Sequence, residues 1–226
     1  MRELPSEPEW SFPPRPETHH ARWISPDPNV PGRVFVAIEA GALVRTLDGG
    51  ETWEDRTPDG PRDTHTLATH RDAPGRLYSA AGDGYMVPGR GYSESGDAGV
   101  TWRRTGGGLR HHYLWGVAVD PGELGTVVVS AAHSPWEAHN PRAAESTIYR
   151  KTAGEPWQES REGLPDVEGR LTAVLVANED EPGVFYALTN KGLYRSPDAG
   201  LSWERLDLSP HDVDQRPTGL AVVEVG

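Results

Sequence analysis

The stretch SPDAGLSW, residues 196–203, decides the fold because close copies of it recur along the chain. Two copies keep the aspartate, the glycine at the fifth position and the tryptophan: TLDGGETW at 46–53 and SGDAGVTW at 95–102. A fourth, KTAGEPW at 151–157, is one residue shorter and lacks the aspartate. The four tryptophans are 49, 55 and 46 residues apart, which is the period of a repeat made of one four-stranded sheet.

Short apolar runs separated by turn residues fill each repeat, and 26 Gly and 21 Pro favour short strands over long helices. In the first repeat we expect strands at 21–25, 33–40, 42–46 and 52–56, and in the last at 171–177, 184–189, 193–196 and 202–206. The sequence therefore predicts an all-β fold, a β-propeller with four blades at about 18–60, 61–109, 110–164 and 165–210. A Pro-rich connector at 1–17 precedes them, and one additional strand at 217–225 follows.

The three intact copies, which we name the Asp turns, have a predicted structural role. Their aspartates can accept hydrogen bonds from backbone N–H groups just ahead, and the glycines at their fifth position provide the left-handed conformation that closes a tight hairpin. The tryptophans then begin the outer strand and pack across the hairpin. These structural residues are Asp48, Gly50, Trp53, Asp97, Gly99, Trp102, Trp157, Asp198, Gly200 and Trp203.

The pattern Ser/Thr-x-Asp-x-Gly-x-Thr/Ser-Trp resembles the Asp-box of the BNR repeat. That repeat occurs in sialidases, photosystem II assembly factor-like proteins, sortilin-type receptors and YVTN-BNR-like bacterial propellers, so the resemblance implies the fold and leaves the function open. Such propellers have more blades, and the chain is similar to one without its N-terminal blades. Whether the ring is closed with four blades, truncated, or completed by another chain through open blade edges stays open at this stage.

Composition excludes several partners. The formal net charge is -12 and Arg and Lys form no basic stripe, so we expect neither nucleic acid nor a membrane as partner. The chain has no cysteine, and no apolar run has the length of a signal peptide or a membrane span. We therefore expect a cytoplasmic protein, and no cofactor is predicted apart from the divalent metal considered below.

The predicted binding site lies at the end of the blades opposite the Asp turns. Two long loops, 81–94 and 131–147, fall there, and extra loop length on a rigid scaffold commonly carries binding. Counting back seven residues from Asp27, Asp72 and Asp120 places His20, His65 and Tyr113 at equivalent entries to the central channel. The predicted ligand-binding residues are His19, His20, Arg22, Asp63, His65, Asp83, His111, His112, Tyr113, Glu137 and His139.

These residues admit three interpretations at this stage. They form a pocket for a small molecule, glycan or protein partner, or a metal site, or they simply line a wet channel. A metal site would use His20, His65 and His112 as imidazole ligands with a carboxylate from Glu137 or Asp83.

Catalysis is the second functional hypothesis. A sialidase needs an arginine triad, a Tyr-Glu nucleophile pair and an acid/base aspartate, and here Arg22, Arg90 and Arg142 with Tyr113 and Glu137 would have to serve. The Arg-Ile-Pro motif of sialidases is absent, as are the Gly-x-Ser-x-Gly and Walker signatures. We therefore expect a non-catalytic binding or scaffold propeller, with a glycoside hydrolase as the alternative.

Overall fold

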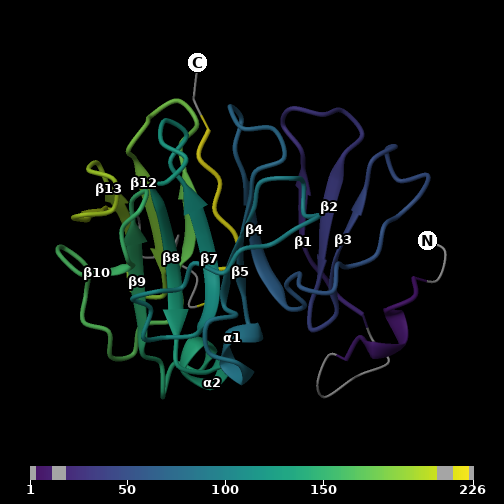
Figure 1. The fold of residues 1–226 in the computed structure, drawn as a ribbon. Helices are drawn as coiled ribbons and strands as arrows, with labels where there is room; N and C mark the ends of the chain where they lie inside the picture. The colour runs from purple at the N-terminus through teal and green to yellow at the C-terminus, as the bar shows by residue number, and fades with distance from the viewer. Residues whose placement is uncertain (1–3, 12–18, 208–215, 224–226) are drawn as a thin grey trace. The chain divides into compact units, whose positions relative to one another are not determined.

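A computed structural model of the 226-residue chain describes residues 4–11, 19–207 and 216–223. Nearly all of its regular structure is antiparallel β-sheet, as predicted. The chain divides into two compact units, Met1–Gly106 and Gly107–Gly226. The strands follow one another in chain order across each sheet (Figure 1).

Unit 1 contains two three-stranded sheets. The first is β1 (Ala21–Pro26), β2 (Val34–Ile38) and β3 (Ala42–Thr46), and the second is β4 (Thr64–Thr69), β5 (Leu77–Ala81) and β6 (Tyr92–Ser95). A short 3-10 helix, η1 (Glu7–Glu9), precedes them, and the helix α1 (Asp83–Met86) lies in the long loop after β5. The fourth strand expected in each blade of this unit is reduced to one bridge, Arg45–Glu54 in the first sheet and Glu94–Arg103 in the second.

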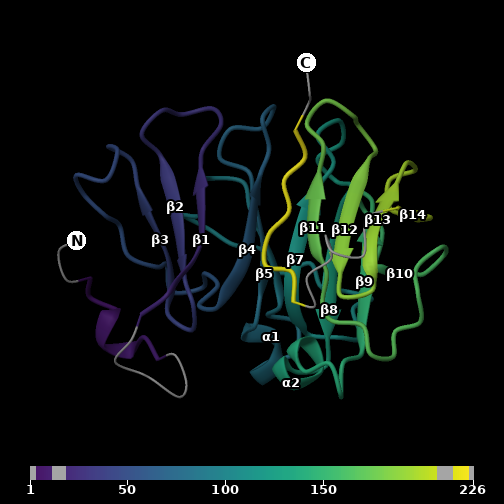
Figure 2. The same ribbon diagram turned by 180° about the vertical axis from the view of Figure 1, so that it is seen from behind.

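Unit 2 contains two four-stranded sheets, as predicted (Figure 2). The first is β7 (Tyr113–Val119), β8 (Val127–Ala132), β9 (Ser146–Lys151) and β10 (Gln158–Ser160), and the second is β11 (Val174–Ala177), β12 (Phe185–Thr189), β13 (Gly192–Ser196) and β14 (Glu204–Leu206). Helix α2 (Pro135–His139) lies in the loop between β8 and β9.

The additional C-terminal strand predicted at 217–225 does not form over residues 216–223, which carry no strand. None of these residues is buried, so their apolar side chains gain little from being held in a ladder. Residues 224 and 225 lie outside the described part of the chain.

Large side chains join the two sheets within each unit. In unit 1, Phe35 and Leu43 of the first sheet pack with Leu67 and Leu77 of the second. In unit 2, Val128 and Ile148 share a buried cluster with a larger group from the next sheet: Leu175, Phe185, Tyr194 and Trp203. Burying such side chains stabilises the fold by about 1.5–3 kcal/mol each, so this packing is the main force that holds neighbouring sheets together.

The N-terminal segment covers the outer face of the first sheet in unit 1. Leu4 and Trp10 are each 7% exposed and pack with Val36, Ile38 and Val44. The backbone N–H and hydroxyl of Ser6 donate to the Asp55 carboxylate at 2.7 and 2.5 Å. The predicted connector at 1–17 is thus packed against the sheet over residues 4–11, while residues 12–17 lie outside the described part.

All three Asp turns have the same hydrogen-bond geometry. In the first, Asp48 Oδ1 accepts from Thr52 N at 2.9 Å, and Asp48 Oδ2 accepts from Thr52 Oγ1 at 2.5 Å. The hydroxyl of Thr46 donates to Asp48 at 2.8 Å and accepts from Gly50 N at 2.9 Å. The same set recurs around the other two aspartates, Asp97 and Asp198.

Each aspartate therefore accepts a backbone N–H group ahead of it, and the glycine at the fifth position of each Asp turn is in the left-handed conformation. Positive φ angles of 99°, 81° and 81° occur at Gly50, Gly99 and Gly200. Hydrogen bonds from Thr52 lower the pKa of Asp48 to about 2, and those from Thr101 lower the pKa of Asp97 to about 2.

A glycine in each connector between sheets faces the tryptophan of the following sheet. A Cβ at Gly60 would lie 3.3 Å from Trp102 Nε1, one at Gly108 2.4 Å from the Trp157 carbonyl oxygen, and one at Gly163 1.7 Å from the Trp203 carbonyl oxygen. Trp157 stays 3% exposed although its turn has no aspartate. The tryptophan therefore keeps its place without the carboxylate, because the connector also holds it.

Candidate functional site

The pairing register corrects the equivalence of the predicted channel residues. Asp27, Asp120 and Asn178 follow the first strands of their sheets, and each accepts a backbone N–H two residues ahead. In the second sheet His70 holds this position, since its Nδ1 accepts from Asp72 N at 3.1 Å. Counting from Asp72 is therefore wrong by two residues.

The corrected count makes Asp63, rather than His65, the equivalent of His20 and Tyr113. His65 instead lies at a β-bulge between Thr64 and Thr66. The same irregularity recurs at Arg22 in β1 and at Trp115 in β7. A bulge turns a side chain away from the regular alternation of a strand, which separates these residues from the set predicted by counting.

In unit 1 the predicted residues Asp63, His65 and Asp83 lie together at the end of the sheets opposite the Asp turns. Asp63 Oδ1 accepts from Ala40 N at 2.7 Å, and Asp63 Oδ2 lies 3.5 Å from His65 Nε2. Asp83 accepts from the backbone N–H groups of Arg62 and Asp63 at 2.9–3.2 Å. The two carboxylates thus fix the entry to β4 against the β2–β3 turn and against α1.

The two carboxyl groups have pKa values displaced in opposite directions. Burial raises the pKa of Asp83 above its ordinary value, and the nearby charge of Asp63 adds to this. Burial also acts to raise the pKa of Asp63, but the hydrogen bond and charge of His65, together with the Ala40 N–H, lower it overall. Gly82 is needed for this arrangement, since a Cβ there would lie 2.1 Å from Asp63 Oδ2.

The remaining predicted residues of unit 1 do not join this pair. His20 lies before β1, with its Nδ1 3.7 Å from Glu39 Oε2. The His19 ring makes an edge contact with Trp10 at 5.2 Å between centroids, and its Nε2 lies 3.9 Å from Glu7 Oε1. Both histidines therefore contact the N-terminal segment or the β2–β3 turn.

In unit 2, His111 lies in a buried cluster. Its Nδ1 is 2.5 Å from Tyr149 Oη, and its ring is 4.1 Å from that of His133 between centroids. Burial, followed by the charge of His133, lowers the pKa of His111 to about 4, so the ring is neutral at neutral pH. Its neighbour His112 is half-buried. The surroundings of His111 fit a structural hydrogen bond better than a ligand contact.

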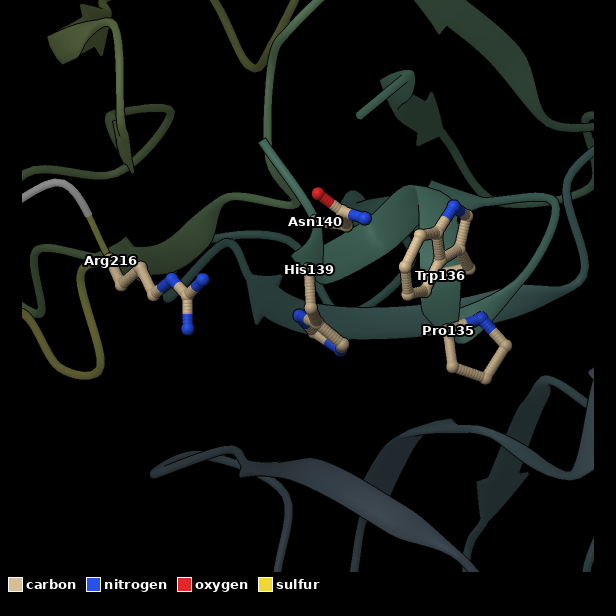
Figure 3. A pocket seen from close by; sticks show the side chains of 5 residues that line it. All are labelled: Pro135, Trp136, His139, Asn140 and Arg216. Carbon is tan, nitrogen blue, oxygen red and sulfur yellow. The ribbon is translucent and has the colours of Figure 1, made fainter. Parts of the chain in front are cut away.

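Helix α2 places a cavity of about 360 Å³ at the end of unit 2 opposite the Asp turns. The lining residues are Pro135, Trp136, His139, Asn140 and Arg216. Figure 3 shows the His139 and Trp136 side chains on the helix, and Arg216 reaching toward them from the C-terminal segment. The Trp136 side chain is 67% exposed, whereas His139 is held by Tyr113 Oη at 3.0 Å and by the Trp115 ring at 4.2 Å. We name this cavity the α2 pocket.

The residues suggested for a sialidase nucleophile pair have other partners. Tyr113 Oη forms a hydrogen bond with His139 Nε2. Glu137 accepts from Ser134 Oγ at 3.2 Å, and its backbone N–H donates to that hydroxyl at 3.3 Å, so the two residues cap α2. Arg90 and Arg142 are exposed in the two long loops, and Arg22 is half-buried at its bulge.

Within residues 4–11, 19–207 and 216–223, no three His, Cys, Asp or Glu side chains gather as a metal ion would require. His20 and His65 belong to unit 1 and His112 to unit 2, so a metal site shared by all three stays a prediction. No helix in the described residues is both long and apolar enough to cross a membrane.

Sequence analysis missed four residues of the α2 pocket and one glycine. Only His139 was predicted, because the count followed histidines and carboxylates; the four missed residues are Pro135, Trp136, Asn140 and Arg216. A signal for α2 was present in SPWEAH at 134–139, where Ser, Pro and Glu occupy the positions of an N-cap, first residue and capping box. Gly82 could not be recognised from the sequence, because the side chain that leaves no room for a Cβ at this position is that of Asp63, 19 residues earlier in the chain.

Comparison with known proteins shows the fold. No protein-family model matches the chain, and no curated protein matches it. Among solved structures, an ancestral GH74 enzyme has a TM-score of 0.65 at 15% identity, covering 84% of this chain and 24% of its own. The GH74 xyloglucanase from Xanthomonas campestris has a TM-score of 0.61 at 19% identity, covering 83% of this chain and 30% of its own. YCF48 bound to D1 peptide has a TM-score of 0.52 at 15% identity, covering 86% of this chain and 56% of its own.

The chain therefore has the fold of a β-propeller and spans about a quarter to a third of the length of these GH74 enzymes. The similar structures include both glycoside hydrolases and a propeller that binds a peptide, so the fold by itself is compatible with either activity.

Proposed function

We propose that this chain is a binding propeller whose ligand contacts the α2 pocket. The observation that carries the proposal is the exposed Trp136 indole beside the polar groups of His139, Asn140 and Arg216, around a cavity of about 360 Å³. Most ligand pockets have volumes of about 300–1,000 Å³ and combine apolar area with a few convergent polar groups. A large aromatic side chain left in water on a rigid element is a common anchor for a glycan or a peptide.

The construction of α2 supports this role. Its first turn is capped by Ser134 and begins at Pro135, and its last residue His139 is fixed by Tyr113. Trp136 is thus presented on a short, capped element rather than on an irregular loop, which lowers the entropy lost when a ligand binds.

The test is 19F NMR of protein labelled with 5-fluorotryptophan. The chain has 8 Trp, and a Trp136→Phe variant assigns the signal of interest. Xyloglucan oligosaccharides and extended synthetic peptides are the probes, since one of the similar structures is a xyloglucanase and another is bound to a peptide. We expect a bound probe to shift the Trp136 signal and to leave Trp102, at an Asp turn, unchanged. A probe that binds while shifting only Asp-turn tryptophans would show that this end is not the binding end.

A glycoside hydrolase is the second candidate, and the Asp63–Asp83 pair favours it. Glycosidases use one protonated and one ionised carboxyl group. The raised pKa of Asp83 favours its protonated form, and the lowered pKa of Asp63 favours its ionised form. The contacts of the pair argue against this role, because both carboxylates already accept hydrogen bonds from backbone N–H groups and so serve to hold the fold. We therefore expect xyloglucan oligosaccharides to remain intact when product chromatography follows their incubation with the protein. Cleavage that is lost in Asp83→Asn and kept in Asp97→Asn would establish the hydrolase instead.

A further inference from the structure

A second cavity, of about 350 Å³, lies in the connector between β10 and β11 of unit 2. It shares no lining residue with the α2 pocket. The residues that matter for its chemistry are Arg161, Leu164, Asp166, Val167, Glu168 and Arg170. None of them belongs to the predicted site. Arg170 directly precedes Leu171, which lies seven residues before Asn178 and is therefore the fourth-sheet equivalent of His20 and Tyr113.

Arg170 is a buried cation that forms no ion pair within the described residues. Its side chain is among the largest that are fully buried, and the residue is 1% exposed. Nε and Nη2 donate to the Ser146 carbonyl oxygen at 3.2 and 2.7 Å, and Nη1 donates to the Pro165 carbonyl oxygen at 2.7 Å. These three hydrogen bonds leave two of the five guanidinium N–H groups without an acceptor among the residues that the structure describes.

A buried charge whose hydrogen-bond partners are carbonyl groups is costly, because carbonyl groups replace lost hydration without neutralising the charge. Burial lowers the pKa of Arg170 to about 10, which is the direction expected when the charged form lacks a close anion. An anion that enters this cavity would find a preformed planar donor, and guanidinium groups suit carboxylates in particular.

The rim of the cavity carries both signs of charge. Arg161 is exposed and pairs with Glu159, while Asp166 and Glu168 are also exposed. Leu164 packs against the buried cluster of unit 2, and Val167 is half-buried beside it in sequence. A simple carboxylate would be attracted by the arginines and repelled by the acids, so the rim favours a ligand that carries both charges and an apolar body.

We propose that this cavity binds a small zwitterion, an α-amino acid with an apolar side chain. Its carboxylate would contact Arg170 and Arg161, its ammonium group Asp166 or Glu168, and its side chain the Leu164 and Val167 surface. The proposal concerns a site separate from the α2 pocket and does not depend on it.

The test is isothermal titration calorimetry of the full chain with three matched probes. L-leucine carries both charges, N-acetyl-L-leucine lacks the ammonium group, and L-leucinamide lacks the carboxylate. We expect saturable binding of L-leucine, with each analogue at least about tenfold weaker, since each loses one charge-assisted contact. Absence of saturable L-leucine binding would overturn the proposal, and so would equal affinity for all three probes.

Variants locate the site. Asp166→Asn removes one exposed charge and is expected to weaken L-leucine binding, whereas Asp180→Asn, the matched change in an exposed loop at the other end of unit 2, is expected to leave it unchanged. Arg170→Lys keeps the charge but loses the planar fork, and should abolish binding; if this variant does not fold, Asp166→Asn and the probe series decide. Trp136→Ala should bind L-leucine as the unmodified protein does, which separates this proposal from the proposed function. L-leucine binding that Trp136→Ala abolishes would contradict the assignment.

Discussion

At the scale of single residues, the Asp turns concentrate several hydrogen bonds on one carboxylate. Asp97 accepts from the hydroxyls of Ser95 and Thr101 and from the Thr101 N–H, and its pKa is about 2. A carboxyl group whose folded-state pKa lies below its ordinary 3.8 stabilises the fold above about pH 4, and this contribution is lost as pH falls toward about 2.

Replacing Asp97 tests this contribution. Asp97→Asn keeps the shape but leaves a single acceptor oxygen, so we expect the Tm at neutral pH to fall by roughly 2–4 °C. The difference from the unmodified protein should shrink as pH falls from about 4 to about 2, measured by circular dichroism melting. Glu155→Gln, in the turn without an aspartate, is the control and should leave the Tm unchanged. A constant difference across this pH range would contradict the mechanism.

His111 should make stability depend on pH in a different window. Its folded-state pKa of about 4 lies below the ordinary 6.5, so the unfolded chain binds the proton more readily. Stability is therefore complete above about pH 6.5 and falls as pH drops toward about 4. His111→Gln cannot titrate but can still accept from Tyr149, and we expect it to flatten this dependence. Urea midpoints at about pH 7.5 and about pH 5 measure the effect. The control is His112→Gln, a change at the half-buried neighbouring residue, and this variant should keep the pH dependence of the unmodified protein.

At the scale of elements, the connector glycines set how closely consecutive sheets pack. Gly163 has φ 78°, and a Cβ there would overlap the Trp203 carbonyl oxygen at 1.7 Å. Gly154 has nearly the same φ, 82°, but nothing lies within 4 Å of its Cβ position. The pair therefore separates the cost of backbone conformation from the cost of lost space.

Alanine at the two glycines should destabilise the protein to different extents. We expect Gly154→Ala to lower the free energy of unfolding by about 1–2 kcal/mol, the cost of the left-handed conformation alone. Gly163→Ala should cost a further 1–3 kcal/mol or so, because the backbone of the Trp203 region must shift. Urea denaturation with unchanged m-values would measure both. Equal losses of unfolding free energy in the two variants would mean that the close approach of Gly163 to Trp203 is not required for stability.

At the scale of the whole molecule, each unit has hydrophobic packing of its own. Trp10 is buried against the first sheet of unit 1, and Trp203 is buried in the shared cluster of unit 2 with its Nε1 donating to Ser160 Oγ at 2.7 Å. If the two units are also thermodynamic units, calorimetry should resolve two transitions.

Truncating each tryptophan tests this. Trp10→Ala should lower the midpoint of one transition and Trp203→Ala that of the other, each by several degrees, because a buried Trp→Ala change costs about 3–5 kcal/mol. One transition that both substitutions lower equally would show that the units unfold together.

Repeats made the fold predictable, and long-range packing made part of the site unpredictable. The Asp turns could be interpreted because every acceptor and donor lies within seven residues, as in Thr46–Thr52. The equivalence of channel residues failed at His70, since an imidazole nitrogen accepts there the hydrogen bond that an Asp or Asn side-chain oxygen accepts in the other sheets, and no local pattern shows this. The α2 pocket and Arg170 depend on contacts between distant segments, such as Arg170 with the Ser146 carbonyl, so composition and spacing carry little trace of them.

The closure of each Asp turn within its own segment has an evolutionary consequence. A tandem duplication that copies a connector together with its sheet also copies the connector glycine and the tryptophan it faces, as with Gly60 and Trp102 or Gly163 and Trp203. The new copy requires no compensating substitution elsewhere, and an old copy can drift until its aspartate disappears, as at 151–157, while Trp157 stays buried. Duplication followed by drift of this kind would keep one sheet architecture across the repeats of this chain while their sequences diverge.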